Sequence, residues 1–226
     1  MENKQATLEL GTKPVGKLLV QYALPAMIAM TASSLYNIVD RIFIGHIPEV
    51  GNTALTGVGV VHPIIVIISA FSAFFGNGGA PLAAIALGRG DRDKAEKILG
   101  NCVTMLTALS VILPTAVFIS MKPLLYAIGA SEATYTYATD YLSIYLLGTV
   151  AVLLTMGLAP FIVAQGRSKL VMVATVASAL TNIVLDWLFV NIFSMGVRGA
   201  AIATVMSQTV SAVWFMIFLC KKADSI

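Results

Sequence analysis

The chain has 226 residues, of which 58% are hydrophobic and only 11% are charged, and its mean hydropathy is +0.89. Ordinary globular domains carry about 25% charged residues, and a chain of this size folded in water would need more polar residues to cover its surface. This composition excludes a soluble enzyme, a nucleic-acid-binding protein and a disordered chain. The net charge of +3 comes from 14 basic and 11 acidic residues, so the positions of these few charges are informative.

Six segments are long and apolar enough to cross the hydrocarbon core of a membrane, which takes about 20 helical residues. In chain order they are residues 18–39, 51–88, 98–121, 141–166, 170–197 and 199–220. The second is too long for one straight crossing and contains Pro63 and a Gly- and Pro-rich run at 76–81, so we expect a long, broken helix there. The sequence predicts an all-α membrane protein with six transmembrane helices. A count of five or seven would require the second segment to be skipped or split.

The basic residues predict the orientation of these helices, because cytoplasmic loops are enriched in Lys and Arg. If the N-terminus is cytoplasmic, eleven basic residues fall on the cytoplasmic side and three (Arg41, Lys122 and Arg198) on the external side. The predicted organisation is therefore a cytoplasmic segment at 1–17, a six-helix transmembrane lobe at 18–220 and a cytoplasmic tail at 221–226.

Sequence motifs of enzymes are missing from the chain. It contains no GxxxxGK[ST], HExxH or GxSxG pattern, which are the signatures of phosphate-binding loops, zinc proteases and serine hydrolases. Cys102 and Cys220 are too few for a structural metal site, and His46 and His62 have no ligand at metal-binding spacing, so we interpret them as a turn residue and an interfacial residue. We expect no catalytic activity and no cofactor.

The expected spans contain two carboxylates, Asp40 and Asp186, and a buried carboxylate usually faces the interior of a helix bundle, pairs, or marks an ion pathway. Polar residues precede each at helical spacing, and a third stripe follows in the last span. If the orientation above is correct, all three stripes reach the outer half of the membrane and can converge. The alternative for Asp40 is an interfacial residue beside Arg41. The stripes are Ser33, Tyr36, Asn37 and Asp40; Thr175, Ser178, Asn182 and Asp186; and Thr204, Gln208 and Ser211.

A carboxylate in a low-dielectric cavity takes up a proton more readily than one in water, and two neighbouring carboxylates titrate as a coupled site. Binding or release of a cation there would bias helix packing between two states. Pro25 lies mid-span in the first helix and is expected to bend it, with a static kink as the alternative. Tyr36, together with Asn37, is placed in a substrate cavity where its aromatic face can hold an organic cation.

Four ordered motifs resemble the multidrug and toxic compound extrusion (MATE) family of transporters. They are YNIVDRIFIG at 36–45, AQG at 164–166, TNIVLD at 181–186 and GVRGAAIAT at 196–204. The resemblance implies the N-terminal lobe of a two-lobe, H⁺- or Na⁺-coupled antiporter that exports organic, often cationic, compounds, here from a bacterial inner membrane. It also implies that Asp40, Asn182, Asp186 and Thr204 form the ion or proton site, with no metal beyond a possible Na⁺.

The chain departs from the family pattern at two points. Ala159 and Val163 stand where family members often have Asn and Arg, which removes a hydrogen bond to the carboxylate site and leaves the coupling ion open. The family has two six-helix lobes, so this chain is expected to be a fragment, a truncated gene product or a half that pairs with a C-terminal lobe or a second copy, and not to transport alone. Alternatives are a lipid or polysaccharide flippase of the same superfamily and a non-transporting membrane scaffold.

Overall fold

The computed structural model describes the backbone of residues 14–223 and the side chains of residues 14–220, and this part of the chain is helical with no strand. The all-α prediction is confirmed. The predicted terminal segments at 1–17 and 221–226 lie largely outside the described residues. The helices are α2 (Val15–Gly45), α3 (Gly51–Gly88), α4 (Arg92–Ile128), α5 (Glu132–Leu147), α6 (Thr149–Ala164), α7 (Ser168–Asp186), the π-helix η1 (Trp187–Ile192) and α8 (Gly196–Ala223).

Six membrane crossings fit the described helices. Five are long and apolar enough on their own, and α5 and α6 together supply a sixth that is bent by 60°. The expected start of the fourth crossing at Tyr141 is wrong, because this crossing begins at Glu132, and it is broken at Gly148. A Cβ atom on Gly148 would collide with the side chain of Val205 on α8, so a residue without a side chain lets the bent pair approach α8.

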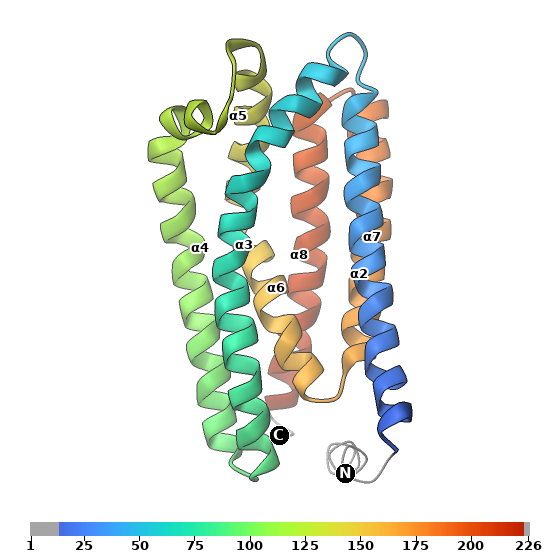
Figure 1. Ribbon diagram of the computed structural model, residues 1–226, viewed down its shortest axis with the longest axis vertical. Helices are drawn as coiled ribbons and strands as arrows, with labels where there is room; N and C mark the ends of the chain where they lie inside the picture. Colours follow the sequence, from blue (N-terminus) through green and yellow to red (C-terminus); the bar gives the residue numbers. More distant parts are fainter. Residues whose placement is uncertain (1–13, 224–226) are drawn as a thin grey trace.

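The expected break in the second segment is also wrong, because α3 is a single α-helix from Gly51 to Gly88 with Pro63 and Pro81 inside it. A proline removes one backbone hydrogen bond and can bend a helix without ending it. Packing against α4, α5 and α6 supports α3 along its length. In Figure 1 the upper part of α3 leans away from the axis of its lower part.

The helices form two groups joined by α8 (Figure 1). The first helix, α2, packs mainly against α7, whereas α3 packs against α4, α5 and α6. The last helix, α8, contacts α5, α6 and α7 and so belongs to both groups. We call the top of the bundle in Figure 1, where the loops at 46–50, 129–131 and 193–195 lie, the upper end. By the charge distribution this end is predicted to be external.

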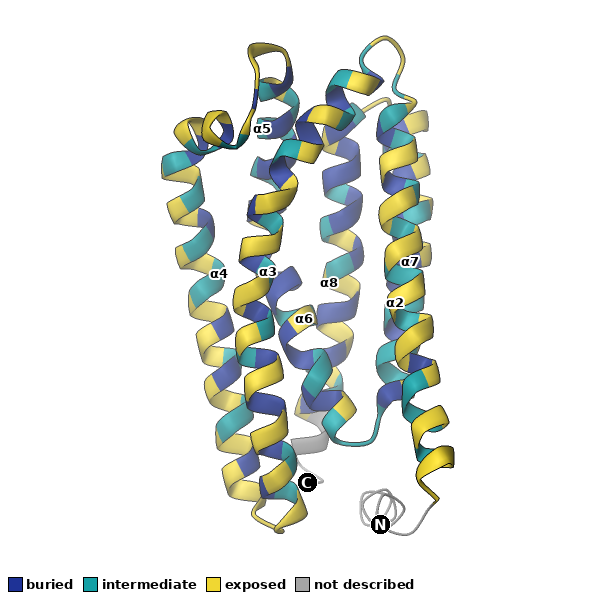
Figure 2. Ribbon diagram, viewed as in Figure 1, coloured by how far each residue is buried: buried dark blue, intermediate teal, exposed yellow. Residues whose placement is uncertain are grey.

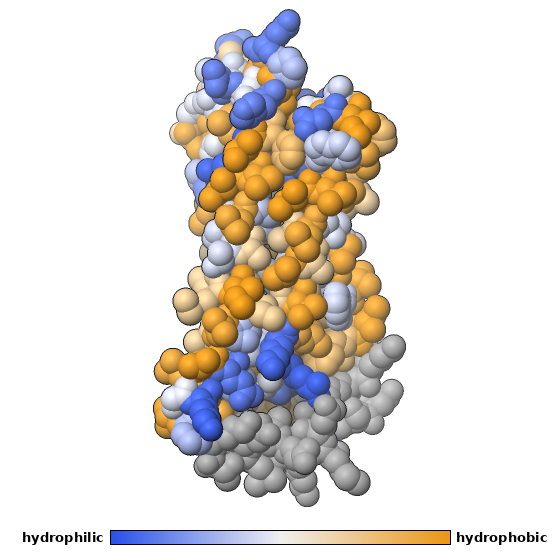
Figure 3. Space-filling model, turned by 90° about the vertical axis from the view of Figure 1, so that its right-hand side faces the viewer, coloured by the Kyte–Doolittle hydropathy of each residue, from blue (hydrophilic) through white to orange (hydrophobic). Residues whose placement is uncertain are grey.

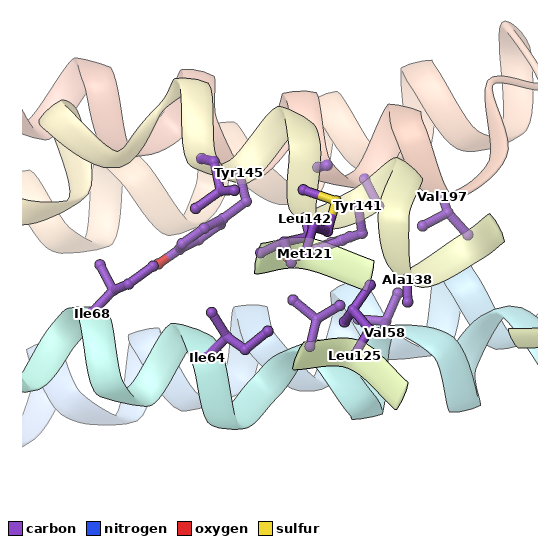
Figure 4. Packing of buried hydrophobic residues seen from close by; sticks show 14 of the residues in the cluster. Val58, Ile64, Ile68, Met121, Leu125, Ala138, Tyr141, Leu142, Tyr145 and Val197 are labelled. Atoms are coloured by element: carbon purple, nitrogen blue, oxygen red, sulfur yellow. The ribbon is translucent and has the colours of Figure 1, made fainter. Parts of the chain in front are cut away.

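Buried residues gather on the inward faces of α3, α5, α6 and α8, while most of α2 is exposed (Figure 2). Near the upper end, hydrophobic side chains of α3, α4 and α5 pack against Tyr141 and Tyr145 (Figure 4). The face shown in Figure 3 is apolar over its middle and hydrophilic toward both ends. That pattern is expected of a bundle surrounded by lipid.

Glycines bring α3 and α6 into close contact. A Cβ on Gly76 would lie 2.8 Å from the backbone oxygen of Gly157, so the two helix backbones touch at this point. One turn away, the hydroxyl of Ser72 donates to the backbone oxygen of Leu153 at 2.8 Å. Small residues with a hydrogen bond beside them are typical of helix crossings in membranes, and this crossing fixes α6 against α3.

Candidate functional site

An open cavity of about 510 Å³ lies between α2 and the helices α3, α5, α6, α7 and α8. Its polar wall comes mainly from the three stripes on α2, α7 and α8, and its apolar wall mainly from α3 and α6. The polar wall contains Ser33, Tyr36, Asn37, Asp40, Thr175, Ser178, Thr204, Gln208 and Ser211, and the apolar wall contains Val58, Ile65, Val66, Val152, Met156 and Ala159. The cavity therefore suits a molecule with both an apolar and a polar part.

Two tyrosines connect other helices to α8 across this cavity. The side-chain amide nitrogen of Gln208 donates to the hydroxyl of Tyr36, on α2, at 3.2 Å. The hydroxyl of Tyr141, on α5, lies close to the side chain of Thr204. Thr204 and Gln208 are four residues apart, which is about one helical turn, so α8 meets α5 and α2 at neighbouring levels.

Asp40 lies in this polar wall and is almost completely buried, with 7% of its surface exposed. Asp186 and Asn182, on α7, are completely buried at 0% exposure and lie outside the cavity lining. Because α7 is the main packing partner of α2, the two carboxylates lie on helices in contact, and Asp40 is an electrostatic neighbour of Asp186.

These three side chains lack hydrogen-bond partners among the described residues. The unpartnered atoms are one carboxylate oxygen of Asp40, both carboxylate oxygens of Asp186, and both the nitrogen and the oxygen of the Asn182 amide. A buried polar atom without a partner costs free energy, and a buried charge costs more. Neutralisation by a bound proton or a hard cation with oxygen ligands would remove most of that cost.

A sequence model of the MatE family matches residues 25–188. The chain belongs to the MATE family. The matched region contains Pro25, Tyr36, Asp40, Asn182 and Asp186 and ends before Thr204 and Gln208. Membership points to a multi-pass membrane transporter and not to an enzyme.

MATE proteins of known sequence and structure align along nearly the whole chain. It is 27% identical over 210 residues to the multidrug export protein MepA of Staphylococcus haemolyticus, covering 93% of this chain and 46% of MepA. A crystal structure of MATE in a bent conformation superposes with a TM-score of 0.87 at 25% identity, covering 99% of this chain and 48% of that one.

A third similar protein is a transporter of the MOP superfamily from Pyrococcus furiosus, whose reversed binding-pocket polarity suggests a different function. It gives a TM-score of 0.86 at 26% identity, covering 96% of this chain and 47% of that one. The chain therefore spans about half the length of the MATE proteins it matches, and it is one lobe of the two-lobe fold.

The structure brings together only part of the predicted ion site. Asp40 and Thr204 line the cavity, as do Tyr36 and Asn37, whereas Asn182 and Asp186 are buried outside its lining. The Asn37 amide donates to the backbone oxygen of Ser33 on its own helix at 2.7 Å. Whether these residues bind the coupling ion remains a prediction.

Pro25 is buried within α2, which continues through it as one helix. Among the departures from the family pattern, Ala159 does lie in the cavity wall, where a longer polar side chain would project into the cavity.

Sequence reasoning missed several residues of the cavity, including three that carry polar rings. His62, interpreted as interfacial, lies in the wall on α3, and Tyr141 and Tyr145 line it from α5. The two tyrosine rings are stacked with centroids 6.3 Å apart. Their spacing of four residues puts both on one face of a helix, and that spacing was the available signal.

Proposed function

We propose that this chain is one lobe of a multidrug efflux antiporter in which a coupling cation, H⁺ or Na⁺, exchanges for an organic, often cationic, compound. The multidrug export activity of the Staphylococcus haemolyticus relative supports the substrate class. The observation that carries the proposal is the set of unpartnered carboxylate and amide atoms on Asp40, Asn182 and Asp186, of which Asp40 lines an amphipathic cavity. These atoms are suited to a cation that binds and leaves.

Competition for one negative charge gives a simple physical basis for exchange. An organic cation in the cavity would be attracted by Asp40 and by the faces of Tyr36, Tyr141 and Tyr145, while the coupling cation would bind Asp40 from the side of Asp186. Each cation reduces the negative charge available to the other, so binding of one favours release of the other. Thr204, which lies beside Tyr141, would supply a further oxygen to the coupling cation.

Transport requires more than this lobe, because transporter sites lie between repeats that rock against each other. We propose that the cavity faces either a C-terminal lobe or a second copy of the chain, in a bacterial inner membrane with both termini cytoplasmic. The lipid bilayer covers the remaining apolar surface.

The test uses variants that remove one charge without changing size. Asp186→Asn and Asp40→Asn should abolish efflux of a fluorescent organic cation by the chain joined to the half of MepA that its match leaves uncovered. Asp140→Asn is the matched control, because Asp140 lies outside the cavity lining and pairs with Arg198 at 2.8 Å. Efflux that survives both Asp40→Asn and Asp186→Asn would refute the carboxylate role.

Ion binding can be followed without a second lobe. Trp187 directly follows Asp186, so its fluorescence should respond when a cation binds there, and Trp214→Phe removes the other tryptophan of the chain. Separate titrations with Na⁺ and with H⁺ identify the coupling ion. A scaffold or a flippase would show no such cation response. A flippase would instead move a lipid-linked substrate across the membrane of vesicles that contain the protein.

A further inference from the structure

We propose that Gln208 is a positioning residue for the cation site, which it serves by holding Tyr36 and so fixing the register of α2 on α8. This inference rests on the proposed function, because it concerns the site at Asp40. It starts from the hydrogen bond between the Gln208 amide and the Tyr36 hydroxyl, which joins residues 172 positions apart in the chain.

Hydrogen bonds to neighbouring helices hold the segment of α8 around Gln208. The backbone oxygen of Gln208 accepts from the hydroxyl of Thr155 on α6 at 3.0 Å. The hydroxyl of Ser178, on α7, donates to the backbone oxygen of Ser207 at 2.7 Å, and Ser211 donates to the backbone oxygen of Ala174 at 3.3 Å. This part of α8 is therefore a fixed point in the bundle.

The first helix is more exposed than the others that line the cavity. Only Pro25, Asp40 and Ile44 are buried among the described residues of α2, and its main contact is the packing against α7. Ridge-into-groove packing against α7 sets the approximate position of α2 along its axis. The directional hydrogen bond that Tyr36 accepts from a fixed point on α8 makes that position more precise.

The geometry of the two helices then determines the level of Asp40. The helices α2 and α8 run in opposite directions, with α2 ending and α8 beginning at the upper end (Figure 1). Asp40 follows Tyr36 by four residues and Thr204 precedes Gln208 by four, so each lies about 6 Å nearer that end than the bonded pair. The Tyr36–Gln208 hydrogen bond thus places the carboxylate of Asp40 at the level of Thr204 and of the neighbouring Tyr141.

Two variants remove this link with little change in shape. Gln208→Met keeps the length of the side chain but not its amide, and Tyr36→Phe removes only the hydroxyl. Thr209→Val is the matched control, because the Thr209 hydroxyl donates to the backbone oxygen of Val205 within α8 at 2.8 Å. Gln208→His keeps a nitrogen donor at this position, so it should retain part of the helix register and of the cation affinity that Gln208→Met loses.

The first measurement is the distance between α2 and α8 by paired spin labels. Labels at Ile38→Cys and Val213→Cys lie on exposed positions, in a chain whose Cys102 and Cys220 are replaced. Gln208→Met and Tyr36→Phe should each broaden or shift the distance distribution, whereas Thr209→Val should leave it unchanged. An unchanged distribution in both variants would overturn the proposal.

The second measurement is the cation titration by Trp187 fluorescence. Each variant should raise the half-saturating cation concentration about threefold, the size expected of one hydrogen bond between membrane helices. The variant that combines Gln208→Met and Tyr36→Phe should bind the cation no more weakly than either single variant, because both remove the same hydrogen bond. Additive effects would overturn the proposal. Changed distances with a cation response that does not shift would also overturn it. If the variants change the distances but the parent chain itself shows no cation response, the proposed function is refuted. Gln208 would then set the helix register without serving a cation site.

Discussion

The crossing of α3 and α6 allows a sharp prediction about stability. Gly76→Ala adds a Cβ atom 2.8 Å from the backbone oxygen of Gly157, and 3.0 Å from its Cα atom. Both neighbours are backbone atoms that cannot rotate away, so the helices must separate. Overpacking of this kind costs about 1–3 kcal/mol, and the nearby hydrogen bond from Ser72 to Leu153 would lengthen as the helices part.

A matched control lies two residues further along the same helix. A Cβ atom on Gly78 would meet nothing within 4 Å, so Gly78→Ala should gain the helix-propensity advantage of alanine, about 0.5–1 kcal/mol. Gly76→Ala gains the same advantage and loses more through the collision. The free energy of unfolding of the two variants should therefore differ by about 1–3 kcal/mol, with Gly78→Ala the more stable.

Reversible unfolding in mixed SDS–detergent micelles, followed by circular dichroism, measures this difference. The comparison of two alanine variants cancels the contribution of helix propensity, so the collision alone remains. Equal stability of Gly76→Ala and Gly78→Ala would show that α3 and α6 are not in backbone contact at Gly157, and it would refute the reasoning.

Three further predictions concern the stability of the bundle, its orientation in the membrane and its transport activity. Ser72→Ala should lower the free energy of unfolding by about 0.5–1.5 kcal/mol, because the hydroxyl of Ser72 joins two helices. Ser120→Ala should lower it less, because the hydroxyl of Ser120 bonds within its own helix. A larger loss in Ser120→Ala than in Ser72→Ala would contradict this reasoning. An impermeant thiol reagent on intact cells, in a chain with Cys220 replaced, should label Glu132→Cys but not Arg92→Cys; the opposite pattern would invert the topology. Cells making this chain alone should retain a fluorescent organic cation, and robust efflux would show that a second lobe is unnecessary.

Much of the cavity could be predicted from helical spacing. Polar residues three and four positions apart must share one face of a helix, and most of the residues on the three expected stripes do line one cavity. Spacing does not specify how deeply a neighbouring helix covers the end of a stripe. The stripe on α7 therefore contributes Thr175 and Ser178 to the wall, while its continuation, Asn182 and Asp186, is buried.

The break at Gly148 could not be predicted, because one glycine in an apolar run is tolerated in many straight helices. Its effect depends on Val205, which is distant in sequence and occupies the space that a Cβ would need. The reverse error arose at Pro63 and Pro81, where strong local signals for a break were outweighed by packing on three neighbouring helices.

The pairing of α2 with α7 has a consequence for how the protein is made. Residues 15–45 emerge from the ribosome first, but their main packing partner begins only at Ser168. At synthesis rates of about 5–20 residues per second, roughly 7–28 seconds pass between the completion of α2 and the completion of α7. During this interval the carboxylate of Asp40 lacks the environment that α7 provides in the folded lobe. The insertion machinery, a lipid head group or water must solvate it until α7 packs against α2. The insertion of α2 therefore depends on groups outside the folded lobe until α7 has been made.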